Sequence, residues 1–233
     1  MTENAYTPGS DAAGSAGHQP ERTPTAIDAV AEKWVATLAE LEPRLAVWLG
    51  GMPDTGGYGD LSPAGAEAYA DAARATIAEL DALAPADAVD EVTKVDLRDA
   101  LALDVEEREA GLHLRDLNVI ASPAQDIREV FDLMPTSTVE DWEVVSVRLG
   151  NVAGAIDGYI ESLREGIRRG IVPAKRQVRE VFEQAKKLSD SDGFFAGLAA
   201  NATPDGGQLP ASLANELSGR AGEAAVAYQE LAD

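Results

Sequence analysis

The sequence predicts an all-α fold, an antiparallel array of long helices that follows a disordered N-terminal tail. Apolar residues recur every three or four positions through each long segment, and no segment alternates with the period of two that strands require. Glycine- and proline-rich stretches separate these segments, as expected for helices joined by loops. Residues 1–23 are small, polar and aperiodic, which predicts the tail, so residues 24–233 form the helical domain.

The first helix is predicted to begin at Thr25, and Pro43 is expected to kink or divide it. Its apolar face is formed by Ile27, Val30, Trp34, Leu38, Leu41, Leu45 and Trp48. The segment "GGMPDTGGYGDLSP" (50–63) is rich in turn-forming residues and predicts a flexible connection. It lacks the spacing of glycines and lysine that phosphate-binding loops share.

Ser62 followed by Pro63 is typical of a helix start, and that second helix is expected to stop at Pro85. A third helix is predicted from Val89 to about Leu114. The inward residues of the two helices are Tyr69, Ala73, Ile77, Leu80, Val92, Leu97, Leu101, Val105 and Leu112. The segment "DIREVFDLM" (126–134) predicts a short helix that ends before a proline.

A capping box, with Ser137 as the cap and Glu140 three positions later, predicts the start of the longest helix. Its core face is formed by Trp142, Val145, Leu149, Val152, Ile156, Tyr159 and Leu163. Gly154 and Gly158 lie four residues apart, which favours a close helix neighbour. Pro173 restarts a helix whose inward residues are Val178, Val181, Phe182, Ala185 and Leu188.

The last helix follows the loop "NATPDGGQLP" (201–210) and carries an apolar stripe that continues almost to Asp233. The stripe consists of Leu213, Leu217, Ala221, Ala224, Tyr228 and Leu231. No capping glycine and no polar tail follow it, which indicates that the chain is one part of a longer protein. We therefore expect a missing C-terminal half, or self-association through the last helix. In the alternative, this helix docks on the bundle.

Composition excludes several classes of protein. There is no apolar run of membrane-spanning length and no secretory signal, so no membrane partner is expected. The chain has no cysteine, which favours a cytoplasmic location. The formal net charge of −22 opposes binding to nucleic acid.

The sequence offers no complete set of catalytic or metal-binding residues. His113 follows Glu109 by four positions, but a zinc site needs three or four ligands, and the other histidine, His18, lies in the predicted tail. No cysteine nucleophile and no strand–turn–helix serine motif is present. We therefore predict no catalytic residue, no metal ligand and no cofactor in this chain.

Residues 163–188, "LREGIRRGIVPAKRQVREVFEQAKKL", contain eight basic and three acidic residues, so they carry +5 while the rest of the chain carries −27. Arg168, Arg169, Lys175 and Arg176 cluster around the turn between Gly170 and Pro173. Such a patch is suited to a phosphate or nucleic acid, to the rim of a substrate site, or to docking of another part of the protein. Docking is favoured because most exposed charges are structural.

The segment "FDLMPTSTVEDWEVVSVRLGNVAGAIDGYIESLREGIRRGIVPAKRQVREVFEQ" resembles the middle of the bacterial domain of unknown function 885 family. "LRDLNVIASPAQDI" and "YGDLSPAGAEAYADAARATIAELDAL" are similar to the same family, so the resemblance covers about residues 25–190. It implies an all-helical, longer protein with zinc-dependent peptidase activity. The resemblance places the zinc ligands and the general base in a C-terminal His-Glu-x-x-Pro-Gly-His motif, which this sequence lacks, so no catalytic residue carries over.

Two functional interpretations remain open. The chain is the non-catalytic N-terminal helical portion of a zinc peptidase-like protein of unknown substrate, or it is a self-sufficient helical binding or scaffolding module without enzymatic activity. In the first case the basic turn, Arg168 to Arg176, faces the acidic remainder of the protein or the carboxylate of a substrate.

Overall fold

A computed structural model of the chain describes residues 22–50 and 52–233, and this part is all-α, without strands. The helices are α1 (Ala26–Leu41), α2 (Leu45–Leu49), α3 (Pro63–Asp81), α4 (Ala88–Glu109), α5 (Pro123–Glu129), α6 (Val139–Arg169), α7 (Lys175–Leu188), α8 (Phe194–Ala200) and α9 (Ala211–Ala232). Two 3₁₀ turns, η1 (Leu112–Arg115) and η2 (Val130–Asp132), complete them. The predicted all-α class is therefore confirmed. The predicted tail, residues 1–23, lies outside the described residues except for its last two.

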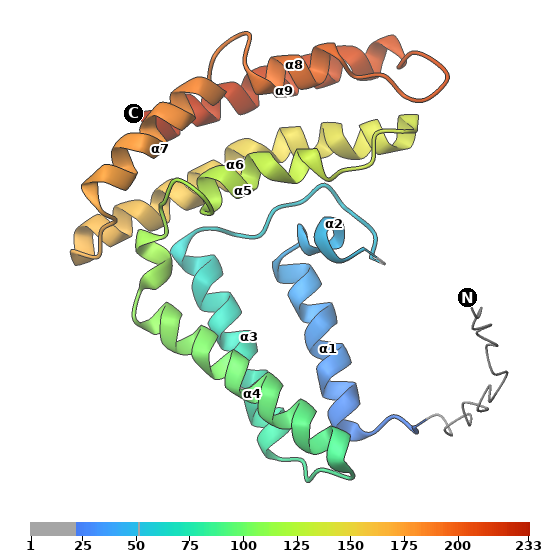
Figure 1. Cartoon of the computed structure of the whole chain (residues 1–233), viewed down its shortest axis with the longest axis vertical. Coiled ribbons are helices and arrows are strands. Elements are labelled where there is room, and N and C mark those ends of the chain that lie inside the picture. The colour runs from blue at the N-terminus through green and yellow to red at the C-terminus, as the bar shows by residue number, and fades with distance from the viewer. Residues whose placement is uncertain (1–21, 51) are drawn as a thin grey trace, which may run out of the picture.

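The helices form two sets that meet at a steep angle (Figure 1). Helices α1, α3 and α4 make up a three-helix unit, which stands below α6 in this view. The second set is a long-helix layer, in which α7 and α8 run back past α6 and α9 then returns alongside them. The main hydrophobic core lies in this layer, between α5, α6, α8 and α9.

The three-helix unit has a small core of its own. Thr25 caps α1, as predicted, and Trp34 packs edge-on against Tyr69 of α3 with ring centroids 5.6 Å apart. Leu101 is buried beside them, and Leu80 is buried in a neighbouring cluster with Ile27 and Val30. Ser62 caps α3 ahead of Pro63, which confirms the predicted start, but the helix ends at Asp81, before Pro85.

Three predicted inward positions of this region are wrong, namely Trp48, Val92 and Leu112, the last of which is 38% exposed in η1. Pro43 separates α1 from the short helix α2, whose Trp48 is 56% exposed because the chain changes direction at the break. Val92 on α4 is 62% exposed, because only the face that carries Leu97 and Leu101 meets α1 and α3. The prediction that α4 continues to Leu114 is also too long, since the α-helix ends at Glu109 and η1 follows.

Helix α6, with 31 residues, spans the long-helix layer. The structure contains a capping box at its start, one residue later than predicted. The side chain of Thr138 accepts from the amide of Asp141, and the side chain of Asp141 accepts from the amide of Thr138. The predicted core face is confirmed from Trp142 to Tyr159. Leu163, the last residue of that face, is only partly buried against a smaller cluster.

The loop before α3 is held on α6 rather than free, which corrects the predicted flexible connection. Arg148 donates to the carbonyl of Gly57 (3.0 Å), and Asn151 donates to the carbonyl of Gly56 (2.9 Å). Gly56 has a φ of +69°, and a Cβ there would lie 3.0 Å from the carbonyl oxygen of Val144, so only glycine fits this approach. The loop thereby fixes where α3 begins relative to α6.

Glycines in α6 permit close contact with the backbone of neighbouring loops and of η1. The prediction of a close helix neighbour at Gly154 and Gly158 is wrong. A Cβ on Gly158 would lie 3.0 Å from the amide nitrogen of Ser62, which belongs to the loop before α3, and Gly154 has no neighbour within 4 Å. Gly166 is the tightest position, because its Cβ would collide with the carbonyl oxygens of Leu114 and Ile171. These contacts bring η1 against the end of α6.

The C-terminal helices complete the long-helix layer. Helix α8 (Phe194–Ala200) was not predicted, and its Phe195 is buried against Phe131 and Tyr228. Leu217 and Tyr228 of α9 are also fully buried, so the last helix docks within the chain and these two side chains form no exposed stripe. Self-association of the chain stays a prediction, but it would have to use surface residues other than Leu217 and Tyr228.

None of the helices within residues 22–50 and 52–233 combines the length and the apolar character that a membrane span needs.

Candidate functional site

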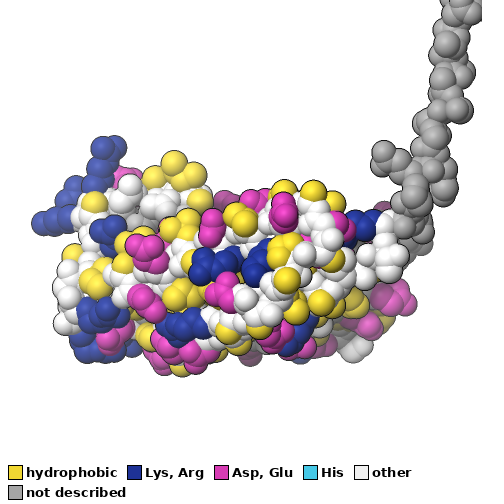
Figure 2. Space-filling view, turned by 90° about the horizontal axis from the view of Figure 1, so that it is seen from below, with side chains coloured by type: hydrophobic (Ala, Val, Ile, Leu, Met, Phe, Trp, Pro, Cys, Tyr) yellow, Lys and Arg dark blue, Asp and Glu magenta, His cyan; other side chains and the backbone are white. Residues whose placement is uncertain are grey.

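The four basic residues predicted as a site lie at one end of the molecule. Arg168 and Arg169 occupy the last turn of α6, Gly170 ends that helix with a φ of +72°, and Lys175 and Arg176 open α7. All four are exposed, and Figure 2 shows Lys and Arg side chains gathered at this left-hand end. The four residues of the predicted cluster therefore all lie on the surface of the molecule.

The structure does not bring the four around one cavity. Arg168 forms an ion pair with Glu165 (2.5 Å), and the guanidinium of Arg169 lies near Gly111. Arg176 lines a groove together with Val119 and Gln184. The arrangement can therefore bind a broad, charged partner better than it can enclose a small anion.

Helix α7 adds apolar contact area that was predicted to be core. Val178 is 43% exposed and Phe182 is 39% exposed, because only Val181 and Ala185 of this helix are buried. The ammonium of Lys186 lies 5.6 Å from the centroid of the Phe182 ring. We call this surface the basic face; it comprises Arg168, Arg169, Val172, Lys175, Arg176, Val178, Arg179, Phe182 and Lys186.

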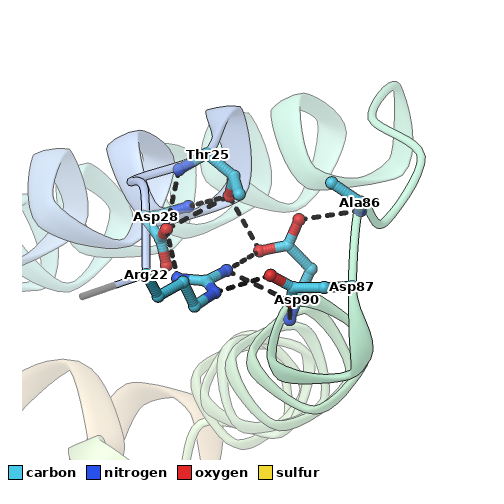
Figure 3. Close-up of polar contacts among 6 residues, drawn as sticks. All are labelled: Arg22, Thr25, Asp28, Ala86, Asp87 and Asp90. Atoms are coloured by element: carbon cyan, nitrogen blue, oxygen red, sulfur yellow. Dashed lines mark hydrogen bonds and ion pairs between the residues drawn. The ribbon is translucent and has the colours of Figure 1, made fainter. Parts of the chain in front are cut away.

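A second group of charges surrounds Asp90, whose side chain is only 1% exposed (Figure 3). Arg22 pairs with Asp28 (2.5 Å), Asp87 (2.7 Å) and Asp90. The Asp90 carboxylate also accepts from the hydroxyl of Thr25 (2.7 Å) and from the amide of Ala86 (2.9 Å). The cluster holds the start of α1 against the start of α4. Both oxygens of Asp90 are already hydrogen-bonded, so this carboxylate is not available for catalysis or for a ligand.

A polar pocket of about 200 Å³ lies where the three-helix unit meets α6, and we call it the junction pocket. It is lined by Glu42, Arg44, Asp60, Leu61, Ser62, Gly65, Ala66, Tyr69, Arg108, His113, Asp116, Pro123, Asp126, Tyr159 and Ser162. These residues come from the α1–α2 junction, the start of α3, the end of α4, η1, α5 and α6. Such a convergence of polar groups in a concavity is typical of binding sites.

Helix α6 fixes the walls of the junction pocket. Tyr159 donates its hydroxyl hydrogen to the carbonyl of Asp116 (2.7 Å), and Ser162 donates to the carbonyl of Leu61 (2.7 Å). Asp60 accepts from the amide of Ser62 (2.9 Å) at the start of α3. The backbone on three sides of the pocket is therefore held by hydrogen bonds to side chains.

Two guanidinium groups supply positive charge to the junction pocket. Nη2 of Arg44 lies 3.3 Å from Glu42, and Nη1 lies 3.6 Å from Asp126. Its Nε is buried and has no hydrogen-bond partner within residues 22–50 and 52–233. The guanidinium carbon of Arg108 lies 3.6 Å from the centroid of the Tyr69 ring. The ring holds Arg108 in place by a cation–π contact, and Nη1 of Arg108 also donates to the carbonyl of Asp104 (3.3 Å).

The neighbouring titratable groups are shifted toward their neutral forms. Burial, and then the charge of Asp126, raises the pKa of Asp116. Burial, and then the positive charges of Arg108 and Arg169, lowers the pKa of His113 below 6.5, so its imidazole is neutral at pH 7. Nδ1 of His113 is buried and finds no hydrogen-bond partner among the residues that the structure describes. Perturbed pKa values of this kind are common at functional sites.

The junction pocket does not fit the zinc site that the family resemblance implies. His113 is its single imidazole, whereas zinc needs three or four protein ligands. Within the described ranges, no three His, Asp or Glu side chains are grouped as a metal site requires. His113 and Glu109 do not share a helix face either, because α4 ends between them and Glu109 pairs with Arg74 at 3.0 Å.

Sequence reasoning missed the junction pocket because its residues are scattered from Glu42 to Ser162 without a common spacing. The one signal in the sequence is His113, which local pattern offers as a metal ligand, a salt-pair residue or a helix-end histidine, but not as part of a pocket. Its environment depends on how η1 packs on α6, and that contact cannot be read from local periodicity.

A family model described as "Bacterial protein of unknown function (DUF885)" matches residues 43–233, which is most of the chain. Among curated proteins, none matches.

Proposed function

Because the chain belongs to the bacterial DUF885 family, we propose that it is the non-catalytic, N-terminal helical portion of a zinc peptidase-like protein, which docks the remainder of that protein through the basic face. The peptidase part of this proposal rests on the family resemblance of the segments around α6. The docking part rests on one observation, a basic and partly apolar surface on an otherwise acidic chain. We place the protein in the cytoplasm because it is acidic and has no cysteine.

The basic face has the composition of an interface. Val178 and Phe182 lie four residues apart on the outer side of α7, so together they form an apolar stripe. Lys175, Arg179 and Lys186 lie on the same side and carry positive charge around the stripe. An acidic amphipathic helix is the partner that would bury the stripe and neutralise its rim.

Charge also supports a protein partner over nucleic acid. The basic segment carries +5 against −27 on the rest of the chain, so a polyanion as long as DNA would be repelled by neighbouring surfaces. A short acidic helix contacts the basic face alone. Its binding would weaken at high salt, because exposed charges are screened within about 8 Å at physiological ionic strength.

The test is a titration of a separately expressed C-terminal half, bearing the His-Glu-x-x-Pro-Gly-His motif, against this chain. Lys175→Glu with Arg179→Glu should weaken binding at least ten-fold at low salt, and Phe182→Asp should weaken it at both low and high salt. The matched control is Arg98→Glu, an exposed α4 residue paired with Asp81. Equal affinities for all variants would refute docking through the basic face.

A second candidate is a self-sufficient binding module, and one feature of α4 favours it. The outer side of α4 exposes Val89, Val92 and Val95 beside the acidic residues Glu91 and Asp96. This surface complements the basic face, so two copies of the chain could bind head to tail. Sedimentation of the chain alone distinguishes the candidates, because a mass that rises with concentration and falls with salt supports the module.

A further inference from the structure

In the part of the chain that the structure describes, the junction pocket holds one guanidinium, Arg108, and two carboxylates, Asp60 and Asp116, that have no charged partner. Within the described residues, Arg108 has no carboxylate oxygen within ion-pair distance, and Asp116 has no basic nitrogen within that distance, whereas Arg44 is shared between Glu42 and Asp126. Arg108 is partly buried, where a charge without a partner is unfavourable, whereas Asp116 is exposed to solvent at the edge of the pocket. Here charges of opposite sign line the same cavity.

Buried polar atoms in the same pocket also lack partners. Nε of Arg44 is a hydrogen-bond donor, and Nδ1 of His113 is a donor or an acceptor according to the tautomer. The hydroxyls of Tyr159 and Ser162, by contrast, already donate to backbone carbonyls. The groups left for a ligand are therefore Arg108, the unbonded Nε of Arg44, the imidazole, and the carboxylates of Asp116 and Asp60, of which Asp60 already accepts from the amide of Ser62.

Access to these groups is provided by a neighbouring depression. Arg108, His113 and Asp116 also line a second cavity of about 370 Å³, together with Glu107, Leu112 and Arg115. The three residues therefore form a wall between two cavities, and a ligand can reach them from the outer one.

We propose that the junction pocket binds a small ligand of the α-amino acid class, with its carboxylate on Arg108 and Arg44 and its ammonium on Asp116. A guanidinium recognises a carboxylate through paired N–H donors, and a carboxylate recognises an ammonium by charge and hydrogen bonding. The volume of about 200 Å³ admits an amino acid or the end of a longer molecule, but it is too small for an extended ligand.

This inference does not depend on docking through the basic face, because none of the residues that hold the ligand belongs to that face. A result that refutes one proposal therefore does not refute the other. The two are measured with different partners, a small zwitterion in one case and a protein half in the other.

The experiment titrates the full chain with glycine, acetate and methylammonium, and it follows the amide resonances of residues 108–116 and the imidazole signal of His113 by NMR. Glycine should bind at least about ten-fold more tightly than either single-charge probe, because each charged contact contributes to affinity. Equal binding of glycine and acetate would mean an adventitious ion only and would overturn the proposal.

Variants sharpen the test. Asp116→Asn should reduce glycine binding to the level of acetate, and Arg108→Gln should reduce it to the level of methylammonium, while Arg108→Lys should retain part of it. The matched control, Arg98→Gln, removes an exposed α4 guanidinium outside the pocket and should change nothing. Circular dichroism confirms that each variant is folded. Glycine shifts that persist unchanged in Asp116→Asn and Arg108→Gln, or that are absent from the wild-type chain, would refute the assignment.

Discussion

Arg148 of α6 is completely buried and forms an ion pair with Asp54, which lies 94 residues earlier in the chain. The same guanidinium donates to the carbonyl of Gly57 and lies 5.3 Å from the Tyr58 ring. One side chain therefore holds three residues of the loop, Asp54, Gly57 and Tyr58, against α6. This contact connects the three-helix unit to the long-helix layer.

Replacement of Arg148 is expected to be strongly destabilising. Arg148→Ala leaves the Asp54 carboxylate without its cation and opens a cavity, so the free energy of unfolding should fall by about 3–5 kcal/mol. Urea denaturation measures this change. Arg98→Ala breaks an exposed pair with Asp81 and should cost no more than about 1 kcal/mol. A loss below 1 kcal/mol for Arg148→Ala would show that the loop is not held as described.

The cluster around Arg22 predicts sensitivity to acid. The Thr25 amide and Arg22 lower the pKa of Asp28 below 3.8, and Arg22 lowers the pKa of Asp87 in the same direction. A carboxyl whose pKa is lower in the folded state stabilises the fold above the unfolded value near 3.8, and this contribution is lost as pH falls through the folded value. The urea midpoint should therefore fall as the pH drops below about 4.

A matched variant isolates this contribution. Asp28→Asn should flatten the acid dependence, whereas Asp99→Asn, an exposed change on α4, should leave it steep. Identical pH curves for the wild-type chain and Asp28→Asn would contradict the assignment of the effect to this cluster.

Two glycines of α6 should respond in opposite directions to alanine. A Cβ on Gly166 would press on the carbonyl oxygens of Leu114 and Ile171, so Gly166→Ala should destabilise by about 1–3 kcal/mol. Gly154 has open space around it, so Gly154→Ala should stabilise by about 1 kcal/mol through helix propensity. Thermal denaturation of the two variants checks the signs, and destabilisation by both would indicate a crowded environment at Gly154.

The titration of His113 tests the electrostatics of the junction pocket. Burial and the charges of Arg108 and Arg169 keep its pKa below 6.5, so the neutral imidazole stabilises the fold above that value and the contribution is lost as pH falls through the folded pKa. Arg169→Gln should raise the pKa of His113, because it removes a positive charge. An NMR titration of the imidazole measures both values, and an unchanged pKa would place Arg169 too far away to act.

The helices themselves were largely predictable from local pattern. The core face of α6 from Trp142 to Tyr159 follows from apolar periodicity, and Thr25, Ser62 and Pro63 mark real helix starts. Helix α8 was missed because its seven residues are too few to show a helical period. Val178 and Phe182 were misassigned because periodicity identifies an apolar face but not whether another helix covers it.

The candidate site was less predictable, for a physical reason. The predicted basic residues do lie together at one end, since Arg168 and Arg176 flank a single turn. The junction pocket depends on contacts between segments that are far apart, such as Tyr159 with Asp116 and Ser162 with Leu61. Arg148 illustrates the same limit, because an arginine in a helical pattern is ordinarily expected at the surface.

The loop before α3 also has a consequence for the order in which the chain folds. Helices α3 and α4 are neighbours in sequence and can pair as soon as both have been synthesised, because closing a short loop loses little entropy. The hydrogen bonds that hold the loop cannot form until Arg148, Asn151 and Ser162 have been synthesised, about 90 to 100 residues later. During synthesis we therefore expect an early helical hairpin whose preceding loop is protected from proteases only after α6 has emerged.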